Sequence, residues 1–368
     1  MPGIFQVLPS FHAGGVEQTT LHVANILAEE GVRSFVASAG GALVKKLHPN
    51  VIHICLPLNS KNPYVIFSNL KEIKKNILHH SIQIVHARSR APAWSAYFAA
   101  KETHTKFVTT YHGAYSQNFL KKYYNQVMSF GSPVIVASQY MKNHVKEYYP
   151  NSECVEIPSG IDTDFFSPNC ADQSQIELLK SLWGLDHNSK IILLVGRFTR
   201  IKGHQILLKA ASLSSFKENV HVVFVGDSQN PDLVEELKKE ASSLSIKLHI
   251  HTDEKDIRPF FYMAHLVVIP TIKPEAFGRV TVEAMSMNKM VLVNDLGASS
   301  EVLNDPDWVF DHNDVNDFMK KIDNALSLDV EQGQKIGQQN RARACSQYNI
   351  KNLTKGHIDL YNAIFKAK

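Results

Sequence analysis

Two glutamates frame a stretch of sequence that could hold a ligand carrying several hydroxyl groups and a phosphate. Glu275 follows an apolar run, Leu266–Pro270, that is typical of a buried strand, and Pro274 ends regular structure before it. From Arg279 onward the apolar residues recur at helical spacing, so Glu283 is expected within a helix. Carboxylates accept hydrogen bonds from hydroxyl groups, and we therefore treat both as candidate ligand-binding residues.

The residues between the two glutamates add hydrogen-bond donors. Phe277, Gly278, Arg279 and Val280 lie where the helix is expected to begin. The first N–H groups of a helix have no partner inside it, and they attract anions. The stretch therefore predicts backbone contacts to a phosphate-bearing ligand.

Two cations occupy an earlier loop. The run Lys190–Val195 is typical of a strand, and the loop that follows it contains Arg197 and Lys202 before a helix starts near His204. Two cations five residues apart in a strand-to-helix loop can converge on one point, and a diphosphate would suit them.

A glycine pair opens the first helix of the chain. Gly14 and Gly15 follow the expected strand Ile4–Leu8 and precede the amphipathic segment Val16–Leu27. Paired glycines let a backbone approach a phosphate at a helix start, although a tight turn without a ligand has the same signature.

Further polar residues follow two other expected strands. His112 comes directly after Phe107–Tyr111, and Arg88 and Arg90 come after Ile82–His86. Ligands of parallel sheets bind outside the carboxyl ends of the strands, so His112 is expected at a ligand site. The two arginines are candidates for binding the phosphate or carboxylate of a second substrate; salt bridges around a helix start are the alternative.

The elements that must position these residues alternate between strand and helix, and the alternation starts twice. This pattern predicts an α/β protein with two doubly wound parallel sheets, and 368 residues suit two domains. Polar residues and Pro168 across 163–189 indicate the linker. We expect an N-terminal domain at 1–165, a C-terminal domain at 166–349, and a terminal helix within 350–368 that packs back on the first domain.

Composition indicates a globular protein that works inside the cell. Apolar residues make up 44% of the chain and charged residues 20%. The four cysteines are far apart, which favours reduced thiols over disulfides or a metal site. We expect no signal peptide and no membrane span, because no apolar run approaches 18 residues. A cytoplasmic location follows as an expectation.

The net charge of +4 is unevenly distributed. Residues 1–160 are basic, with clusters at Lys45–Lys46, Lys71–Lys75 and Lys121–Lys122, whereas the rest of the chain is net acidic. Lysines beside aromatic residues suit an anionic membrane surface or a phosphorylated acceptor; solvated helix faces are the alternative. No nucleic-acid-binding module is evident.

Over nearly its whole length the sequence resembles the retaining GT-B glycosyltransferases of family four, also called glycosyl transferases group 1. It most resembles bacterial members that act on cell-envelope glycans such as the lipopolysaccharide core. Related sequences often have Gly-Gly where this chain has Ala298-Ser299, and often Ser in place of Thr271. The motifs that carry the resemblance are Glu275 to Glu283 with Phe277-Gly278, Gly196-Arg197 with Lys202-Gly203, Gly14-Gly15-Val16-Glu17, His112-Gly113, and Ile157–Asp162.

The resemblance implies two Rossmann-like domains that face an interdomain cleft. It implies transfer of a hexose from a UDP- or GDP-sugar to a glycan or lipid-linked acceptor, with retention of configuration and with neither metal nor cofactor. Arg197 and Lys202 would bind the diphosphate, Glu283 the ribose and Glu275 the donor sugar, with His112 near the reacting carbon. A peripheral position on the inner face of the cytoplasmic membrane is a further expectation.

Three alternatives remain at this point. Glu275 could act as a glycosidase-type nucleophile, which we discount because Glu283 would be buried in the nucleotide site. The chain could be a GT-B-like nucleotide-sugar epimerase with the same donor site. It could also be a two-domain sugar-binding protein without enzymatic activity.

Overall fold

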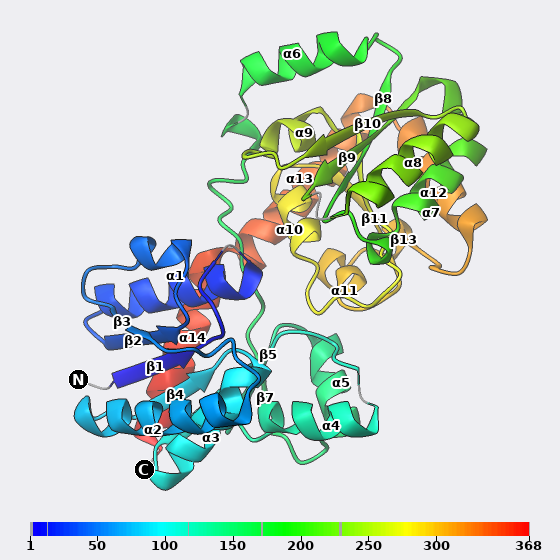
Figure 1. The fold of residues 1–368 in the computed structure, drawn as a ribbon. Helices are drawn as coiled ribbons and strands as arrows, with labels where there is room; N and C mark the ends of the chain where they lie inside the picture. The colour runs from blue at the N-terminus through cyan, green and yellow to red at the C-terminus, as the bar shows by residue number, and fades with distance from the viewer. Residues whose placement is uncertain (1–2, 13, 117, 171, 228–229, 368) are drawn as a thin grey trace. The chain divides into compact units, whose positions relative to one another are not determined.

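The computed structural model describes residues 3–12, 14–116, 118–170, 172–227 and 230–367 (Figure 1). Ala13, in the glycine-rich loop of the sequence analysis, lies outside the described residues. The chain divides into two compact units, here called unit 1 (Met1–Gly160 with Ile350–Lys368) and unit 2 (Ile161–Asn349).

Unit 1 is built on one parallel sheet with the strand order β3-β2-β1-β4-β5-β6-β7 among its described residues. The order reverses beside β1, as in doubly wound folds. Its strands are β1 (Gly3–Val7), β2 (Arg33–Ser38), β3 (Ile52–Cys55), β4 (Ile84–Ala87), β5 (Lys106–Tyr111), β6 (Val134–Val136) and β7 (Cys154–Glu156). Its α-helices are α1 (Gly15–Glu29), α2 (Pro63–His79), α3 (Arg90–Glu102), α4 (Phe119–Gln126), α5 (Gln139–Tyr148) and α14 (Ile350–Lys366).

The C-terminal helix α14 is part of the core of unit 1. Its Leu353 and Tyr361 are buried in one apolar cluster with Ile4 of β1, Ile84 of β4 and Val108 of β5. Figure 1 shows α14 (red) beside these N-terminal strands although it lies at the other end of the sequence. Residues of α14 can therefore contribute to a site in unit 1.

Unit 2 repeats the plan with the strand order β10-β9-β8-β11-β12-β13 among its described residues. Its strands are β8 (Lys190–Val195), β9 (Val220–Gly226), β10 (Lys247–Thr252), β11 (Leu266–Ile269), β12 (Met290–Asn294) and β13 (Val309–Phe310). Its α-helices are α6 (Gln173–Trp183), α7 (His204–Leu213), α8 (Pro231–Ser243), α9 (Arg258–Met263), α10 (Arg279–Ser286), α11 (Ser299–Leu303), α12 (Val315–Ser327) and α13 (Val330–Gln347).

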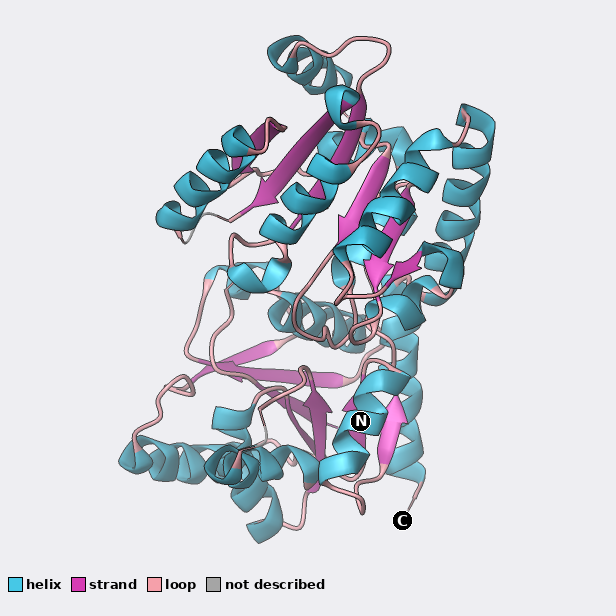
Figure 2. Ribbon diagram, turned by 90° about the vertical axis from the view of Figure 1, so that its right-hand side faces the viewer, coloured by secondary structure: helices cyan, strands magenta, loops and turns pink. Residues whose placement is uncertain are grey.

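Helices lie on both sides of each sheet (Figure 2). In unit 2, α7, α8 and α12 bury apolar residues against the sheet face that carries Ile192, Leu194 and Phe224. The helix α10 packs against α13 and the strand β12. Apolar burial of this kind is the main stabilising contribution to such layered folds.

The first segment of unit 1 ends at Gly160, whereas the sequence analysis placed the end of the N-terminal domain at residue 165. Ile161 pairs with Asn349 in a parallel bridge, and its N–H donates to Tyr348 O at 2.9 Å. These contacts hold Ile161 in unit 2, before Pro168 and the polar residues that marked the linker in the sequence.

Some element boundaries also differ from the expectations. The strand β7 ends at Glu156, before the Pro158 that lacks a backbone N–H group, and β13 did not appear in the sequence analysis. Two residues are too few to show the alternation of side chains that marks a strand. The strand β13 is defined instead by the pairing of Val309 with Val293 of β12. Among the described residues, no helix has both the length and the apolar character needed to cross a bilayer.

Candidate functional site

Three loops meet at the carboxyl edge of the sheet in unit 2. They follow β8, β11 and β12, which are neighbours in the sheet, and they carry Arg197, Lys202, Glu275 and Gly297. All strands of the sheet run parallel, so their carboxyl ends share one edge, where ligands of such sheets bind. The parallel order therefore brings together residues that are far apart in the sequence.

The two cations after β8 are in different environments. Lys202, in the short 3-10 helix Arg200–Lys202, forms an ion pair with the Glu275 carboxylate, and both side chains are about one-fifth exposed. Arg197 is exposed, and its guanidinium has no hydrogen-bond or ion-pair partner among the described residues. One cation is thus paired and positioned, and the other is available to an anion.

Glu275 is positioned by the backbone of a neighbouring loop. It forms a parallel bridge with Gly297, and Ala298 N donates to Glu275 O at 2.9 Å. Gly297 has φ +73°, and a Cβ there would lie 2.5 Å from Glu275 N. Only glycine permits this approach, so Gly297 fixes the place of the Glu275 backbone.

The helix α10 starts without a cap. Gly278 precedes it at φ +82° and no side chain caps it, so its first N–H groups have no partner within the helix. Phe277 is buried and packs edge-on against Tyr348, with ring centroids 5.5 Å apart. Arg279 is exposed and Val280 is half-buried. The structure brings the predicted Phe277–Val280 stretch to the same edge as Glu275.

Glu283 is buried in α10. Its carboxylate accepts a hydrogen bond from Arg279 Nε at 2.8 Å, one helical turn earlier. Burial raises the pKa of Glu283, while the charges of Arg279 and Lys202 act in the opposite direction. A buried carboxylate held by one arginine retains acceptor capacity for hydroxyl groups of a ligand.

Four buried hydroxyl groups at this edge lack a hydrogen-bond partner. They belong to Thr199, Thr271, Thr281 and Ser299, and they are the only such hydroxyls in the part of unit 2 that the structure describes. A Cβ at Gly278 would lie 2.7 Å from Ser299 Oγ and 3.1 Å from Thr281 Oγ1, so these two face the start of α10. A buried polar group without a partner costs about 1–3 kcal/mol, and such groups call for an explanation.

Sequence reasoning missed the hydroxyls of Thr281 and Ser299. Ser299 stood out in the sequence as a departure from the family pattern and as part of Gly297–Glu301, the expected start of a further helix that could face a phosphate. Its hydroxyl was not singled out, and Thr281 was not singled out at all. The sequence did contain a signal for Thr281. It lies three residues after Gly278, the residue before α10, and therefore in the first turn of the helix. Ser299 reaches Gly278 from a different loop, which no local pattern reveals.

In unit 1, the glycine pair precedes α1. Gly14 is the residue before the helix, and no side chain of the described residues caps α1. A Cβ at Gly15 would meet open space, so packing does not require glycine there. The predicted uncapped helix start is present, and its part in ligand binding stays a prediction.

The structure gives Arg88 a different place from the predicted one. Its side chain is 1% exposed, and its guanidinium donates to Gln6 Oε1 at 3.0 and 2.6 Å and lies 3.3 Å from His357 Nε2. Burial lowers the pKa of Arg88 to about 10. A guanidinium enclosed in this way positions its neighbours, and direct contact with an acceptor does not fit its burial.

Arg90 keeps an accessible position at the start of α3. Its guanidinium carbon lies 3.9 Å from the centre of the Tyr115 ring, and Nη1 donates to Asn125 Oδ1 at 3.0 Å. The side chain is half-buried. An arginine stacked on an aromatic ring is pre-oriented, so Arg90 suits the predicted anion contact better than Arg88.

His112 follows β5, and its buried Nε2 has no hydrogen-bond partner among the residues that the structure describes. Burial, and then the charge of Arg88, lower the pKa of His112 to about 3. The ring is therefore neutral at ordinary pH. It could form a hydrogen bond with a ligand, but it would not carry a proton to one.

Two other histidines near Arg88 are fully buried and neutral. His86 hydrogen-bonds to Tyr361 and Thr110, each at 2.6 Å, and His357 Nδ1 bonds to Leu353 O at 2.9 Å. Burial first, and the Arg88 charge second, lower the pKa of His357 to about 3 and that of His86 well below its usual value.

Because the pKa values of these buried histidines are lowered, we expect the fold to lose stability in acid. Because the folded-state pKa of His357 lies below the unfolded value near 6.5, the unfolded chain binds more protons, and stability falls as pH drops below 6.5. We expect each such histidine to cost about 1 kcal/mol of unfolding free energy per pH unit in that range. Chemical unfolding at pH 7.5 and 5.5 measures the loss, and His357→Gln should reduce it. An unchanged pH dependence in that variant would contradict this.

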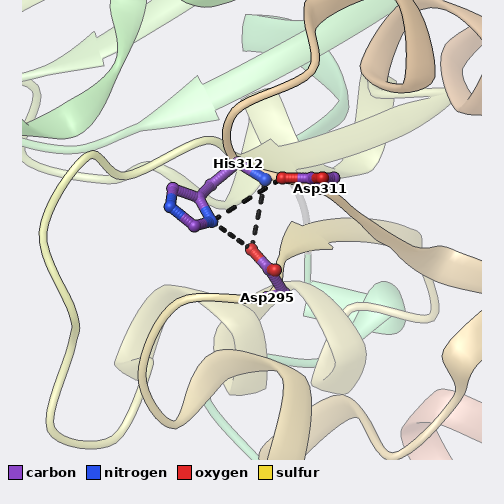
Figure 3. A group of neighbouring side chains, drawn as sticks. All are labelled: Asp295, Asp311 and His312. Atoms are coloured by element: carbon purple, nitrogen blue, oxygen red, sulfur yellow. Dashed lines mark hydrogen bonds and ion pairs between the residues drawn. The ribbon is translucent and has the colours of Figure 1, made fainter.

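A separate polar cluster joins the ends of β12 and β13 (Figure 3). His312 Nδ1 lies 2.7 Å from Asp295 Oδ1 and 3.9 Å from Asp311 Oδ1, and both aspartates are exposed. His312 N also donates to Asp295 Oδ1 at 3.1 Å. These bonds account for the arrangement as a tie between two strand ends, and we assign it no ligand.

Two family models cover most of the chain. The model described as glycosyl transferases group 1 matches residues 175–343, which contain the carboxyl edge of unit 2. The model described as glycosyltransferase family 4 matches residues 13–165, which contain His112, Arg88 and Arg90.

Solved structures and curated proteins agree with these models. A glycosyltransferase from Rickettsia africae ESF-5 is 32% identical, with a TM-score of 0.90, over 100% of this chain and 99% of that chain. Anabaena HepE in complex with UDP and glucose shares the fold, with a TM-score of 0.82 at 19% identity over 99% of this chain and 100% of that chain. The lipopolysaccharide 1,2-N-acetylglucosaminetransferase of Salmonella typhimurium (strain LT2) is 28% identical over 47% of this chain.

The chain spans less than two thirds of the curated relatives, for example 46% of the Salmonella protein. The match to the Rickettsia structure, in contrast, covers 99% of that chain. With two doubly wound parallel sheets, two family models and this match, the chain belongs to the group 1 glycosyltransferases of the GT-B fold.

Proposed function

We propose that this glycosyltransferase moves a sugar from a UDP- or GDP-sugar to a cell-envelope glycan or lipid-linked acceptor. In this proposal the anomeric configuration is retained and no metal takes part. The observation that carries it is the edge of unit 2, where two cations, an uncapped helix start and partnerless hydroxyls lie together. A nucleoside diphosphate linked to a sugar matches each of these groups.

Arg197 and Lys202 would stabilise the negative charge that builds on the leaving diphosphate. Preorganised charge of this kind is usually the largest contribution to catalysis. Lys202 is paired with Glu275 in the structure, so a diphosphate would compete with Glu275 for it. The Glu275 carboxylate would then be free to accept hydrogen bonds from hydroxyls of the donor sugar.

The remaining donor contacts follow from α10. Glu283 would accept hydrogen bonds from the ribose hydroxyls, because it is a buried carboxylate whose one partner among the described residues is Arg279. The N–H groups of the Phe277–Val280 stretch would face the donor. In unit 1, the start of α1 after Gly14 and Gly15 would offer further N–H groups to the diphosphate.

Acceptor and donor sugar would also meet residues of unit 1. His112 would form a hydrogen bond as a neutral ring near the reacting carbon. Burial, and then the charge of Arg88, lower the pKa of His112 and His357 and so favour their neutral forms. Arg90 would bind an anionic group of the acceptor. The UDP complex of HepE supports a nucleotide-sugar donor, and the Salmonella relative supports an envelope glycan as acceptor.

Peripheral contact with an anionic membrane is part of the same proposal. Phe119 and Tyr123 of α4 are 75% and 61% exposed, and Lys121 and Lys122 lie between them. Exposed aromatics beside lysines suit a lipid interface. Sedimentation with phosphatidylglycerol vesicles tests this contact. If the double variant Phe119→Ser with Tyr123→Ser sediments with the vesicles as well as the wild type does, the contact is rejected.

The partnerless hydroxyls give a test that does not require the acceptor. Thr281→Val and Ser299→Ala each remove a buried hydroxyl, so we expect the unliganded protein to become more stable by up to about 1 kcal/mol. We expect the same changes to reduce the stabilisation by UDP or GDP, because the nucleotide loses a donor. Melting temperatures with and without nucleotide measure both effects, with Ser300→Ala as control. Full nucleotide stabilisation in both variants would show that the hydroxyls do not face the ligand.

Incubation with a nucleotide sugar tests the activity. The chain is incubated with UDP- and GDP-sugars without acceptor, and the products are identified by mass spectrometry and chromatography. The proposal expects release of nucleoside diphosphate, at least slowly, and no interconversion of the sugar. An epimerised nucleotide sugar would identify an epimerase, and binding without any turnover, even with envelope extracts, would favour a sugar-binding protein.

A further inference from the structure

The amino edge of the sheet in unit 2 carries a second group of basic residues. Lys190 opens β8, His265 precedes β11, and Lys289 precedes β12. Leu266 pairs with Ile192 on one side and Met290 on the other, so the three residues lie along one edge of three neighbouring strands. This edge is opposite to the one that holds Arg197 and Lys202.

These three residues line a cavity of about 290 Å³. Its other walls are largely apolar and include Met263, Leu326 and Leu328. A neighbouring cavity of about 430 Å³ also has Met263 and His265 in its lining. A space of this size is near the lower end of small-molecule sites.

The basic residues present hydrogen-bond donors to this space. Ile191 N donates to His265 Nδ1 at 3.0 Å, so the proton of the neutral ring is on Nε2. Burial, and then the charges of Lys190 and Lys289, lower the pKa of His265 to about 4, which keeps the ring in this form. His265 therefore offers an N–H group.

The two lysines lack a counter-ion. Lys289 Nζ donates to Tyr262 O at 2.6 Å, and neither Lys289 nor Lys190 forms an ion pair in the part of the chain that the structure describes. Among the described residues of the lining, the one carboxylate is that of Asp329, which accepts the Gln332 N–H at 2.8 Å and caps α13. Desolvation lowers the pKa of Lys289 to about 8, because it disfavours the charged form, and a bound anion would offset that cost.

We propose that this cavity is a second ligand site of unit 2, which binds a small organic anion with a phosphate or carboxylate group and an apolar part. The anionic group contacts Lys190, Lys289 and His265, and the apolar part packs on Met263 and Leu326. The site does not depend on the donor site, because it lies at the other edge of the sheet.

Calorimetric titration of the full chain with phenyl phosphate and with benzoate tests the proposal. Phosphate could also bind at Arg197, so the titration is repeated in Arg197→Ala, where we expect the affinity for this cavity to be unchanged. Lys190→Met and Lys289→Met should each weaken binding by about tenfold, as expected for a charge-assisted hydrogen bond. The neutral analogue benzyl alcohol should bind much more weakly than either anion.

Which anion binds identifies the ligand class. Tight binding of phenyl phosphate alone indicates a phosphomonoester, and binding of benzoate alone indicates a carboxylate. The proposal is overturned if neither probe binds at millimolar concentration, if both lysine variants bind normally, or if Arg197→Ala abolishes binding. If Lys289→Met does not fold, Lys190→Met alone decides.

Discussion

Replacing Arg197 with alanine is expected to lower turnover of the nucleotide sugar by at least about tenfold, equivalent to about 1.4 kcal/mol of barrier. The guanidinium is exposed and partnerless among the described residues, so its loss should leave folding intact. It should remove a charge that acts on the leaving diphosphate. The rate of nucleoside diphosphate release at saturating donor measures the effect.

Lys202→Ala is expected to have an effect of the same size. Here the substitution also leaves the Glu275 carboxylate without its cation, so the melting temperature is recorded alongside the rate. Arg200→Ala is the matched control, since Arg200 lies in the same loop and pairs with Glu236 at the surface. Full activity in both Arg197→Ala and Lys202→Ala would reject the diphosphate assignment.

Glu283→Ala is expected to weaken nucleotide binding by about tenfold or more, with a smaller effect on the rate at saturating donor. A carboxylate that accepts hydrogen bonds from hydroxyls contributes about 1.5–3 kcal/mol, and this contact is made before and during the reaction alike. The dissociation constant of UDP or GDP measures it. Glu235→Ala, which removes a surface carboxylate of α8, is the control.

A different result would change the role of Glu283. Unchanged nucleotide affinity would reject the ribose contact. A large fall in rate with unchanged affinity would favour a role in the chemical step. Arg279 loses its hydrogen-bond partner in this variant, so the stability of the unliganded protein should be compared with the wild type before affinities are interpreted.

Local patterns in the sequence were sufficient to predict the fold. Strands such as Lys190–Val195 and Leu266–Ile269 are continuous apolar runs because both faces of a parallel strand are covered by helices. Turn residues between them then separate strand from helix. The predicted GT-B architecture is confirmed by the two sheets and by the solved structures that share the fold. The two-residue strand β13 was missed because it is defined by pairing alone.

The candidate site was predictable only where its residues are local in sequence. Arg197, Lys202 and the residues from Glu275 to Glu283 follow strands, and the parallel sheet brings their loops to one edge. The burial of Arg88 could not be predicted, because its partners Gln6 and His357 are 82 and 269 residues away. The approach of Ser299 to Gly278 is hidden for the same reason.

The central claim is that the carboxyl edge of unit 2 binds the nucleoside diphosphate of the donor. Calorimetric titration of UDP and GDP into the wild type and into the double variant Arg197→Ala with Lys202→Ala tests it most directly. We predict that one of the nucleotides binds the wild type and that its affinity falls by about a hundredfold in the double variant, from two charge-assisted contacts. Equal affinity of the two proteins, or no binding of either nucleotide to the wild type, would contradict the claim.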